Sequence, residues 1–327
     1  MTRPTVSVVA PLFNEAENVA RLVAELLAVL RPLGEPFEIV LVDDGSSDET
    51  WQRIQDAARP EPAVRGVSLL RNFGHQSALL AGLAQASGRA VISMDGDLQH
   101  PPALIPELLA AWREGARVVN TRRLDSEDTG WFKRWSSRAF YRVFSALSGI
   151  DLPPGSSDFR LLDAEIVDAV LKTRDPEPFL RGLIHWLGGP AATVAFRARP
   201  RHAGLSKFDL RRMARLSVQG LVSFSTVPLR LGIWAGLFTS ALAFAEILYI
   251  LVQYARGQTV PGWASALTVV SFMFGVLFIL LGILGTYLAS IHQAIRNRPL
   301  YLVGRTVGAA GDGGRARSAA NPRWSAA

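Results

Sequence analysis

The stretch Val91-Ile92-Ser93-Met94-Asp95-Gly96-Asp97-Leu98-Gln99-His100-Pro101-Pro102 decides how the rest of the chain is interpreted. It begins with an apolar run typical of a buried strand, and the run stops at two carboxylates separated by one glycine. The two prolines prevent an immediate helix, so Asp95 and Asp97 are expected at the end of a strand. Paired carboxylates there suit a hard divalent cation whose other ligands are water and substrate phosphate. An ordinary polar turn is the alternative interpretation.

Short apolar runs and helix-like segments alternate from about residue 5 to residue 121. Apolar residues recur at three- and four-residue spacing in the helix-like segments, whereas the runs have the length of strands. This alternation predicts a mostly parallel α/β sheet with helices on both faces. Because ligands bind at the carboxyl ends of such strands, the polar clusters at 11–15, 43–48 and 95–97 are expected along one edge. The expected strands are residues 6–10, 39–42, 64–70, 90–94, 118–120 and 193–197, and the expected helices are residues 15–30, 48–58, 76–86 and 103–112.

The composition limits the kinds of site and partner. The 327 residues include no cysteine, which excludes disulfides, thiolate metal ligands and a cysteine nucleophile. A formal net charge of +7 admits nucleic acid, anionic lipid or a polyanionic substrate as partners, so the location of the charge decides among them. The mean hydropathy of +0.20 is high for a soluble protein and indicates a membrane segment.

Two segments in the C-terminal third have the length and composition of transmembrane helices. Residues 231–254 contain one charge, Glu246, and residues 264–291 contain none. At 1.5 Å per residue, each segment can cross about 30 Å of hydrocarbon. Lysine and arginine are concentrated before the first segment and after the second, whereas the short connecting loop holds only Arg256. The positive-inside rule therefore predicts an integral, multi-pass membrane protein with its α/β domain and both termini in the cytoplasm.

Other segments refine this organisation. Residues 131–147 mix aromatic and basic side chains, which fits either a helix on the membrane surface or a partly buried amphipathic helix. Residues 308–327 are rich in Gly, Ala, Ser and Arg without periodicity, so we expect disorder there. Much of the basic excess lies beside the membrane, so nucleic acid is not expected as a partner. No signal peptide is expected in residues 1–18. Glu246 is an intramembrane carboxyl that could pair with a neighbouring helix or another subunit, or lie near the interface.

Several motifs, taken in order along the chain, resemble glycosyltransferase family 2. The resemblance is strongest to the branch that uses polyprenyl phosphate, which includes dolichyl-phosphate mannose synthase and the bactoprenol glucosyltransferases. Single motifs are weakly specific, but the ordered set covers about residues 5–307. The motifs are Pro11-Leu12-Phe13-Asn14-Glu15, Val42-Asp43-Asp44-Gly45-Ser46-Ser47-Asp48, Arg71-Asn72-Phe73-Gly74-His75-Gln76, the stretch from Asp95 to Pro102, Ser157-Asp158-Phe159-Arg160-Leu161, Arg181-Gly182, residues 201–207, Pro228-Leu229-Arg230 and Arg298-Pro299-Leu300-Tyr301.

The resemblance implies a Rossmann-like GT-A fold and an enzyme that transfers a sugar, with inversion, from a UDP- or GDP-linked donor to polyprenyl phosphate of the undecaprenyl or dolichyl type. It also implies Mg²⁺ or Mn²⁺ on the donor diphosphate, acting as Lewis acid and template. Residue by residue, it assigns metal binding to Asp95, Asp97 and Gln99, and donor-nucleotide binding to Pro11, Phe13, Asn14, Glu15, Asp43, Asp44 and Asp95. It assigns acceptor-phosphate binding to Arg122, Lys133, Ser137, Arg201, Ser206 and Lys207, and catalysis to Asp158 and Asp97.

The predicted domains combine the motifs with the charge pattern. They are a cytoplasmic GT-A catalytic domain at residues 1–206, juxtamembrane amphipathic helices at 207–229, a two-helix transmembrane hairpin at 230–291, a cytoplasmic C-terminal segment at 292–307 and a disordered tail at 308–327. The expected partners are a nucleotide sugar, a polyprenyl phosphate lipid and the bilayer, and a homo-oligomer is admissible.

The role of Asp158 stays open in the sequence. The family's equivalent aspartate is generally described as a catalytic base, yet a phosphate monoester with a second pKa of about 6 is mostly dianionic at neutral pH. We therefore expect Asp158 mainly to position the acceptor or the sugar and to balance Arg160. One alternative is a related transferase with a lipid or glycan hydroxyl acceptor, in which Asp158 acts as a base. Another is a catalytically silent scaffold that binds anionic lipid.

Residues 291–296 depart from the resemblance, because they lack the acidic residue that relatives usually carry there.

Overall fold

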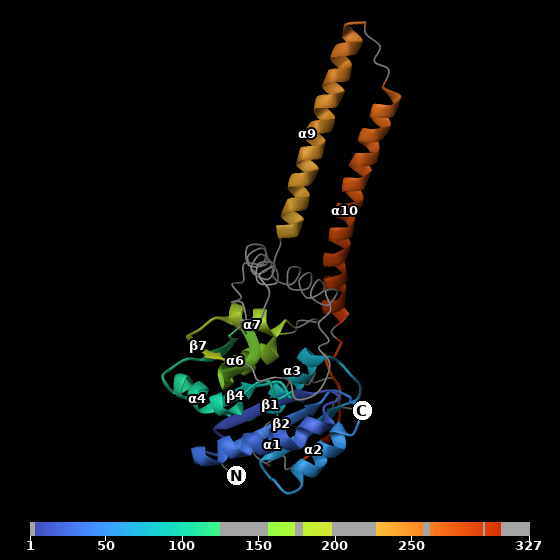
Figure 1. The fold of residues 1–327 in the computed structure, drawn as a ribbon. Coiled ribbons are helices and arrows are strands. Elements are labelled where there is room, and N and C mark those ends of the chain that lie inside the picture. Colours follow the sequence, from blue (N-terminus) through green and yellow to red (C-terminus); the bar gives the residue numbers. More distant parts are fainter. Residues whose placement is uncertain are drawn as a thin grey trace.

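The structure is a computed structural model that describes residues 4–124, 156–173, 179–197, 227–257, 262–296 and 298–308. An α/β domain lies at one end of the molecule, and two long helices extend from it (Figure 1). The strands are β1 (Val6–Leu12), β2 (Phe37–Asp43), β3 (Val64–Leu69), β4 (Ala90–Ser93), β5 (Val118–Arg123), β6 (Ser156–Asp163), β7 (Ala191–Phe196) and β8 (Val303–Val307). The α-helices are α1 (Ala16–Leu30), α2 (Thr50–Ala58), α3 (His75–Gln85), α4 (Ile105–Arg113), α6 (Ala164–Lys172), α7 (Leu180–Leu187), α9 (Val227–Ala255) and α10 (Trp263–Arg296).

The described strands form one sheet in the order β7-β5-β6-β4-β1-β2-β3-β8. Strand β1 pairs in parallel with β2 and β4, β2 with β3, and β5 with β7. Strand β6 is antiparallel to both of its neighbours, and β8 is antiparallel to β3. The prediction of a mostly parallel sheet is therefore confirmed.

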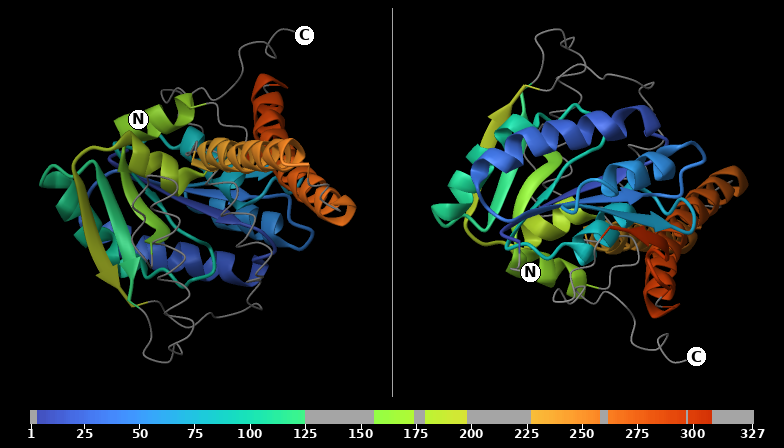
Figure 2. Two further views of the ribbon diagram at one scale, coloured as in Figure 1. Left: turned by 90° about the horizontal axis from the view of Figure 1, so that it is seen from above. Right: turned by 90° about the horizontal axis from the view of Figure 1, so that it is seen from below.

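Helices cover both faces of the sheet (Figure 2), and each face has its own hydrophobic core. On one face, α1, α2 and α4 bury side chains such as Leu22 and Ile54 against the strands. On the other face, α3, α6 and α7 bury side chains such as Leu83. Val8 belongs to the first core and Val9 to the second, because successive side chains of a strand point to opposite faces. The expected helices on both faces are therefore present.

Two strands were not among those expected from the sequence. Strand β6 contains Asp158, Arg160 and Asp163, and these charged residues interrupt the apolar run by which a buried strand is identified. Strand β8 is short, contains Gly304 and Arg305, and is largely exposed at the edge of the sheet. Both strands therefore lack the hydrophobic pattern that revealed the others.

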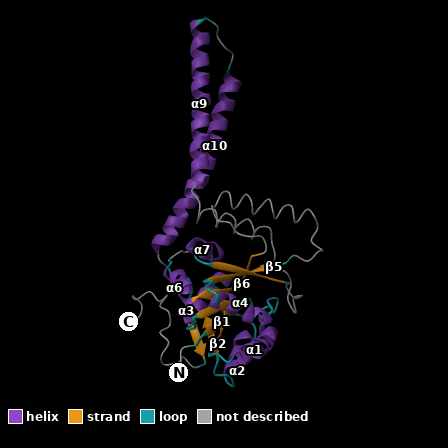
Figure 3. Cartoon of the chain, turned by 90° about the vertical axis from the view of Figure 1, so that its left-hand side faces the viewer, coloured by secondary structure: helices purple, strands orange, loops and turns teal. Residues whose placement is uncertain are grey.

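Helices α9 and α10 pack against each other and are long and apolar enough to cross a membrane (Figure 3). The segments of membrane-spanning length are Leu229–Ala255 and Val269–Arg296, with mean hydropathies of 1.9 and 2.5. Large side chains such as Phe244 and Phe278 are 70% and 67% exposed, which is unfavourable in water but not in hydrocarbon. Both expected helices are present, although α10 continues to Arg296, past the expected end at residue 291.

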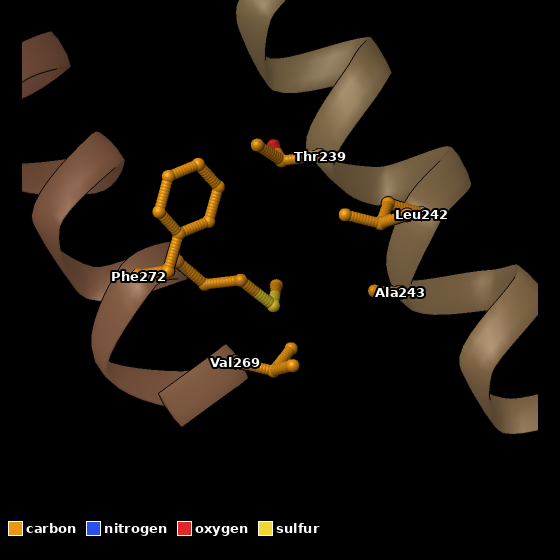
Figure 4. A pocket seen from close by; sticks show the side chains of 6 residues that line it. Thr239, Leu242, Ala243, Val269 and Phe272 are labelled. Atoms are coloured by element: carbon orange, nitrogen blue, oxygen red, sulfur yellow. The ribbon is translucent and has the colours of Figure 1, made fainter. Parts of the chain in front are cut away.

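An apolar cavity of about 210 Å³ lies between these helices (Figure 4). Its lining carries no charge, so the cavity is unsuited to a diphosphate. Glu246 follows Ala243 by one turn of α9 and is half-buried, and its function stays open. The lining residues are Thr239, Leu242, Ala243, Val269, Phe272 and Met273.

After α10 the chain returns to the domain. Strand β8 pairs with β3, and the Leu70 N–H donates to the Leu302 carbonyl at 2.9 Å. Leu300 and Tyr301 pack on the core at the α3 face, where burial raises the pKa of Tyr301 to about 12. These contacts attach the C-terminal end of the hairpin to the edge of the sheet.

Several predicted segments lie outside the described residues. They include the aromatic and basic segment at 131–147, the tail from 309 onward, and the juxtamembrane region up to residue 226. The last residues of that region, 227–229, belong to α9. The predicted domain boundaries therefore stay predictions.

Candidate active site

The loops that follow β1 and β2 are joined by hydrogen bonds at the carboxyl edge of the sheet. Asn14 Oδ1 accepts from the Ser47 N–H at 2.9 Å, and the Asn14 N–H donates to Ser46 Oγ at 3.0 Å. The Glu15 N–H donates to Thr50 Oγ1 at 2.9 Å. Asn14 and Glu15, both predicted to bind the nucleotide, therefore also hold the two loops together.

Pro11 and Phe13, predicted to bind the donor, differ in their exposure. Pro11 is buried in β1 opposite Val42, whereas Phe13 is 37% exposed just past the end of the strand. An exposed aromatic ring at this edge can stack on a nucleobase. Phe13 is therefore accessible to a ligand, whereas Pro11 is part of the buried strand β1.

Asp43 and Asp44 are buried and bonded within the domain. Asp43 accepts from the Ser46 N–H at 3.0 Å and from Ser68 Oγ at 2.9 Å. Asp44 accepts from the Phe73 and Gly74 N–H groups at 2.8 and 2.9 Å. Burial raises the pKa of Asp44 above its ordinary value, and the two N–H donors only partly offset this effect. Both carboxylates therefore organise the loops around the predicted nucleotide site.

Gly45 follows these acids because its neighbours leave no room for a side chain. Its φ is +65°, and a Cβ at this position would lie 2.3 Å from the backbone carbon of Arg71. The loop after β2 thus packs directly on the segment from Arg71 to Gly74. Glycine is required there both for its backbone conformation and for the close approach.

Asp95 and Asp97 follow β4, as the stretch at residues 91–102 predicts. The Asp95 side chain is 37% exposed, whereas Asp97 is buried and accepts from the Gln99 N–H at 3.1 Å. Among the described residues, no group of three or more His, Cys, Asp or Glu side chains is arranged to hold a metal ion. Two carboxylates at an open edge nevertheless fit Mg²⁺ or Mn²⁺ when donor phosphate and water supply the other oxygen ligands. Asp95, Asp97 and Gln99 are therefore compatible with the predicted metal.

His100 joins this stretch to β6. Its Nδ1 accepts from the Asp95 N–H at 3.0 Å, so the neutral ring carries its proton on Nε2, which lies 2.8 Å from Ser157 Oγ. The ring stacks on Phe159 with centroids 5.1 Å apart. His100 therefore fixes the main chain at Asp95 relative to the strand that carries Asp158.

Asp158 lies beside Asp95 because β6 runs antiparallel to β4. Ser93, the last residue of β4, pairs with Arg160, so the start of β6 reaches the carboxyl end of its neighbour. The Asp158 carboxylate accepts two hydrogen bonds from Arg181, at 2.8 Å from Nε and 2.9 Å from Nη2, and lies 3.3 Å from Arg160 Nη2. Burial alone would raise the pKa of Asp158, but Arg181, His75 and Arg160 hold it well below its ordinary range.

His75, the first residue of α3, lies between the two acids. Its Nε2 is 3.5 Å from Asp95 Oδ1 and 3.6 Å from Asp158 Oδ2. Partial desolvation lowers the pKa of His75, but the neighbouring carboxylates of Asp158 and Asp95 raise it overall. The motifs at 71–76 and 181–182 contain His75 and Arg181, but the resemblance assigned no role to either residue. A lone arginine within the apolar segment from Phe179 to Ile184 was the available signal.

Only part of the predicted acceptor site is described. Arg122 is exposed near the end of β5, opposite Ser156 at the start of β6, and so lies at the same edge as Asp158. The remaining acceptor-phosphate residues, Lys133, Ser137, Arg201, Ser206 and Lys207, lie outside the described residues. Their roles stay predictions.

The arrangement combines two chemistries at one edge of the sheet. The exposed Asp95 and the buried Asp97 after β4 are suited to a cation that could in turn bind phosphate oxygens, while Asp158 and its arginines form a charged cluster at the same edge. Such a site is suited to moving a group from a phosphorylated donor to a second, anionic molecule. The fold and the site thus define an α/β group-transfer enzyme.

A family model described as glycosyl transferase family 2 matches residues 7–171. The chain therefore belongs to glycosyltransferase family 2, has the GT-A-like fold of that family, and is a glycosyltransferase. It is 37% identical over 298 residues to an uncharacterised glycosyltransferase of Synechocystis, covering 91% of this chain and 94% of the relative. It is 35% identical over 299 residues to the bactoprenol glucosyl transferase of Shigella phage SfII, covering 91% and 97%.

Solved structures with a similar fold include glucosyl-3-phosphoglycerate synthase from Mycobacterium tuberculosis in complex with Mn²⁺, UDP and phosphoglyceric acid. That likeness has 21% identity and a TM-score of 0.46 over 67% of this chain and 76% of the other. Mannosyl-3-phosphoglycerate synthase from Rubrobacter xylanophilus is similar at 22% identity and a TM-score of 0.45, over 67% and 73%.

Proposed function

We propose that this glycosyltransferase moves a sugar, with inversion, from a UDP- or GDP-linked donor to the phosphate of a polyprenyl lipid at the cytoplasmic face of a membrane. The relative from Shigella phage SfII, named for bactoprenol glucosyl transfer, supports a lipid acceptor. Helices α9 and α10 support a site near the bilayer. The observation that carries the proposal is Asp158, a buried carboxylate held by two arginines beside the open Asp95.

The donor side would use the carboxylates after β4. Asp95, Asp97 and Gln99 would hold Mg²⁺ or Mn²⁺, which supplies charge neutralisation for the leaving diphosphate when it is bound. The ring of Phe13 would contact the nucleobase, while Asp43 and Asp44 keep the surrounding loops in place. The chain's own contribution on this side is therefore to bind and orient the donor.

Asp158 would position the acceptor and would not take its proton. A general base works best with a pKa near the working pH, whereas Arg181 and Arg160 keep the pKa of Asp158 far below neutrality, against the effect of burial. A phosphate acceptor needs no base, because its second pKa of about 6 leaves it mostly ionised near pH 7. A hydroxyl acceptor would need one. The ion-paired state of Asp158 thus favours a phosphate acceptor over a hydroxyl.

The position of α7 supports an acceptor that comes from the membrane. Helix α7, which carries Arg181, lies on the side of the domain toward α9 and α10, and α1 and α2 lie on the opposite side (Figures 1 and 3). A cation at that position can attract an anionic headgroup. Arg122 and the predicted cations at positions 133, 201 and 207 would complete the phosphate site.

A transfer assay with the full-length protein tests this function. Purified protein with Mn²⁺ and undecaprenyl phosphate is mixed with radiolabelled UDP- or GDP-sugars, and we expect the label to enter the organic phase. Chelation of the metal with EDTA should abolish the transfer, and added Mn²⁺ should restore it. Polyprenol without phosphate is the matched acceptor control and should accept no sugar.

The assay also separates the alternatives. Absence of an organic-phase product with every common donor would refute the proposal. Transfer to polyprenol as fast as to its phosphate would favour a hydroxyl acceptor and restore the role of a base to Asp158. Binding to anionic vesicles without any transfer would favour a membrane scaffold.

A further inference from the structure

His75 is carried on a backbone segment that the nucleotide side of the site holds in place. Gly74 before it has a φ of +94°, a conformation that favours glycine. The N–H groups of Phe73 and Gly74 donate to the buried Asp44 carboxylate at 2.8 and 2.9 Å. The position of the imidazole is therefore set by the fold of the loops and not by a flexible surface segment.

The imidazole faces two acceptors with one nitrogen. His75 Nε2 lies 3.5 Å from Asp95 Oδ1 and 3.6 Å from Asp158 Oδ2. A lone pair on Nε2 would repel both carboxylates, so Nε2 carries a proton. The side chain is 42% exposed, which places the ring at the open edge of the sheet and not in the core.

Charge balance alone does not explain why His75 lies between Asp95 and Asp158. Buried Asp158 already has Arg181 and Arg160 as partners, at 2.8 and 3.3 Å. Asp95 is 37% exposed, and a solvated carboxylate gains little from an exposed partner. The feature that only His75 provides among the described contacts of these two acids is a donor that faces both of them.

We propose that His75 is a positioning residue whose Nε2–H sets the spacing between Asp95 on the donor side and Asp158 on the acceptor side. This inference rests on the proposed function, which gives each carboxylate its side. A misplacement of about 1 Å at reacting groups can slow a reaction by about 100-fold. His75 touches only Asp95 among the proposed donor-side residues, so the affinity for a nucleoside diphosphate should depend on His75 much less than kcat does.

The test compares His75→Leu with His75→Gln in the full-length protein. The Gln amide can place an N–H close to the position of Nε2, whereas Leu has no donor. We expect His75→Leu to lower kcat by about 30- to 100-fold, with less than about a threefold change in the affinity for the matching nucleoside diphosphate, measured by calorimetry with Mn²⁺. His75→Gln should keep at least about a third of the wild-type kcat. Gln52→Leu, at an exposed position of α2, is the surface control and should behave as wild type.

Three results would overturn the inference while wild-type transfer is intact. They are a His75→Leu kcat within about threefold of wild type, equal losses in the Leu and Gln variants, and a loss of nucleotide affinity that matches the loss of kcat. A wild-type protein that transfers no sugar to polyprenyl phosphate would instead refute the proposed function, and the inference with it. Melting temperatures of both variants close to wild type exclude misfolding as the cause.

Discussion

The donor side and the Asp158 side of the site are built in opposite ways. The donor-side acid Asp44 binds main-chain N–H groups, and Asp43 binds one N–H and one hydroxyl. Asp158 instead faces side chains from three elements: His75 of α3, Arg160 of β6 and Arg181 of α7. Main-chain N–H donors remain after any substitution except to proline, whereas each side-chain partner can be removed by one substitution. The first arrangement serves the fold, and the second can be tuned to a substrate.

The largest effect, a loss of activity, is expected for Asp95, a donor-side acid that contributes little to the stability of the fold. Asp95 is 37% exposed, and its described side-chain partners, His75 and His100, lie at 3.5 and 3.7 Å. Asp95→Asn should therefore lower the initial rate of sugar transfer by roughly 100- to 1,000-fold while the melting temperature stays unchanged. Glu107→Gln, an exposed acid on α4, is the control. A rate within threefold of wild type would remove Asp95 from the donor site.

A smaller effect, on stability, is expected at Asp44. Asp44→Ala leaves the partly buried N–H groups of Phe73 and Gly74 without their acceptor, which should lower the free energy of unfolding by about 2–4 kcal/mol. Asp44→Asn keeps one acceptor oxygen and should lose less. The apparent melting temperature of the full-length protein measures both changes. If Asp44→Ala melts like wild type but loses nucleotide binding, this acid serves the ligand and not the fold.

The smallest effect is expected at Arg181, and it depends on pH. Burial alone would raise the pKa of Asp158, but Arg181 and its neighbours hold it below the unfolded value near 4. The ion pair therefore stabilises the protein above that pH, and the stabilisation is lost as the pH falls through the lower native pKa. Arg181→Met should cost only about 1–2 kcal/mol near pH 7, because Arg181 is 36% exposed.

The difference between wild type and Arg181→Met should narrow in acid. Melting temperatures of the two proteins, measured from neutral pH to about pH 3, should approach each other, because Asp158 takes up its proton at a higher pH in the variant than in wild type. Arg181→Lys keeps the charge without the paired geometry and should fall between them. A constant difference across this range would show that the ion pair with Asp158 is not the source of the effect.

The donor side was predictable from the sequence because its motifs directly follow strands with clear apolar runs. Val91 to Met94 leads into Asp95, and the run ending at Val42 leads into Asp43, so parallel strands alone place these acids at one edge. The two long apolar segments also predicted α9 and α10, because each segment is apolar over almost its whole length.

The Asp158 cluster was not predictable in the same way. Its partners lie on α3, β6 and α7, and their meeting depends on β6 inserting antiparallel between β4 and β5. No local pattern encodes that insertion, because Asp158 and Arg160 break the apolar run of β6. The resemblance marked His75 and Arg181 as parts of motifs, but their contact with one carboxylate is a property of the tertiary structure.

Strand β8 imposes an order on how the protein is made. The edge of β3 stays open after β1 to β7 have been synthesised, and it is covered only when residues 303–307 emerge behind α10. An open edge is prone to pair with other chains. The catalytic sheet is therefore completed only after both apolar helices have left the ribosome.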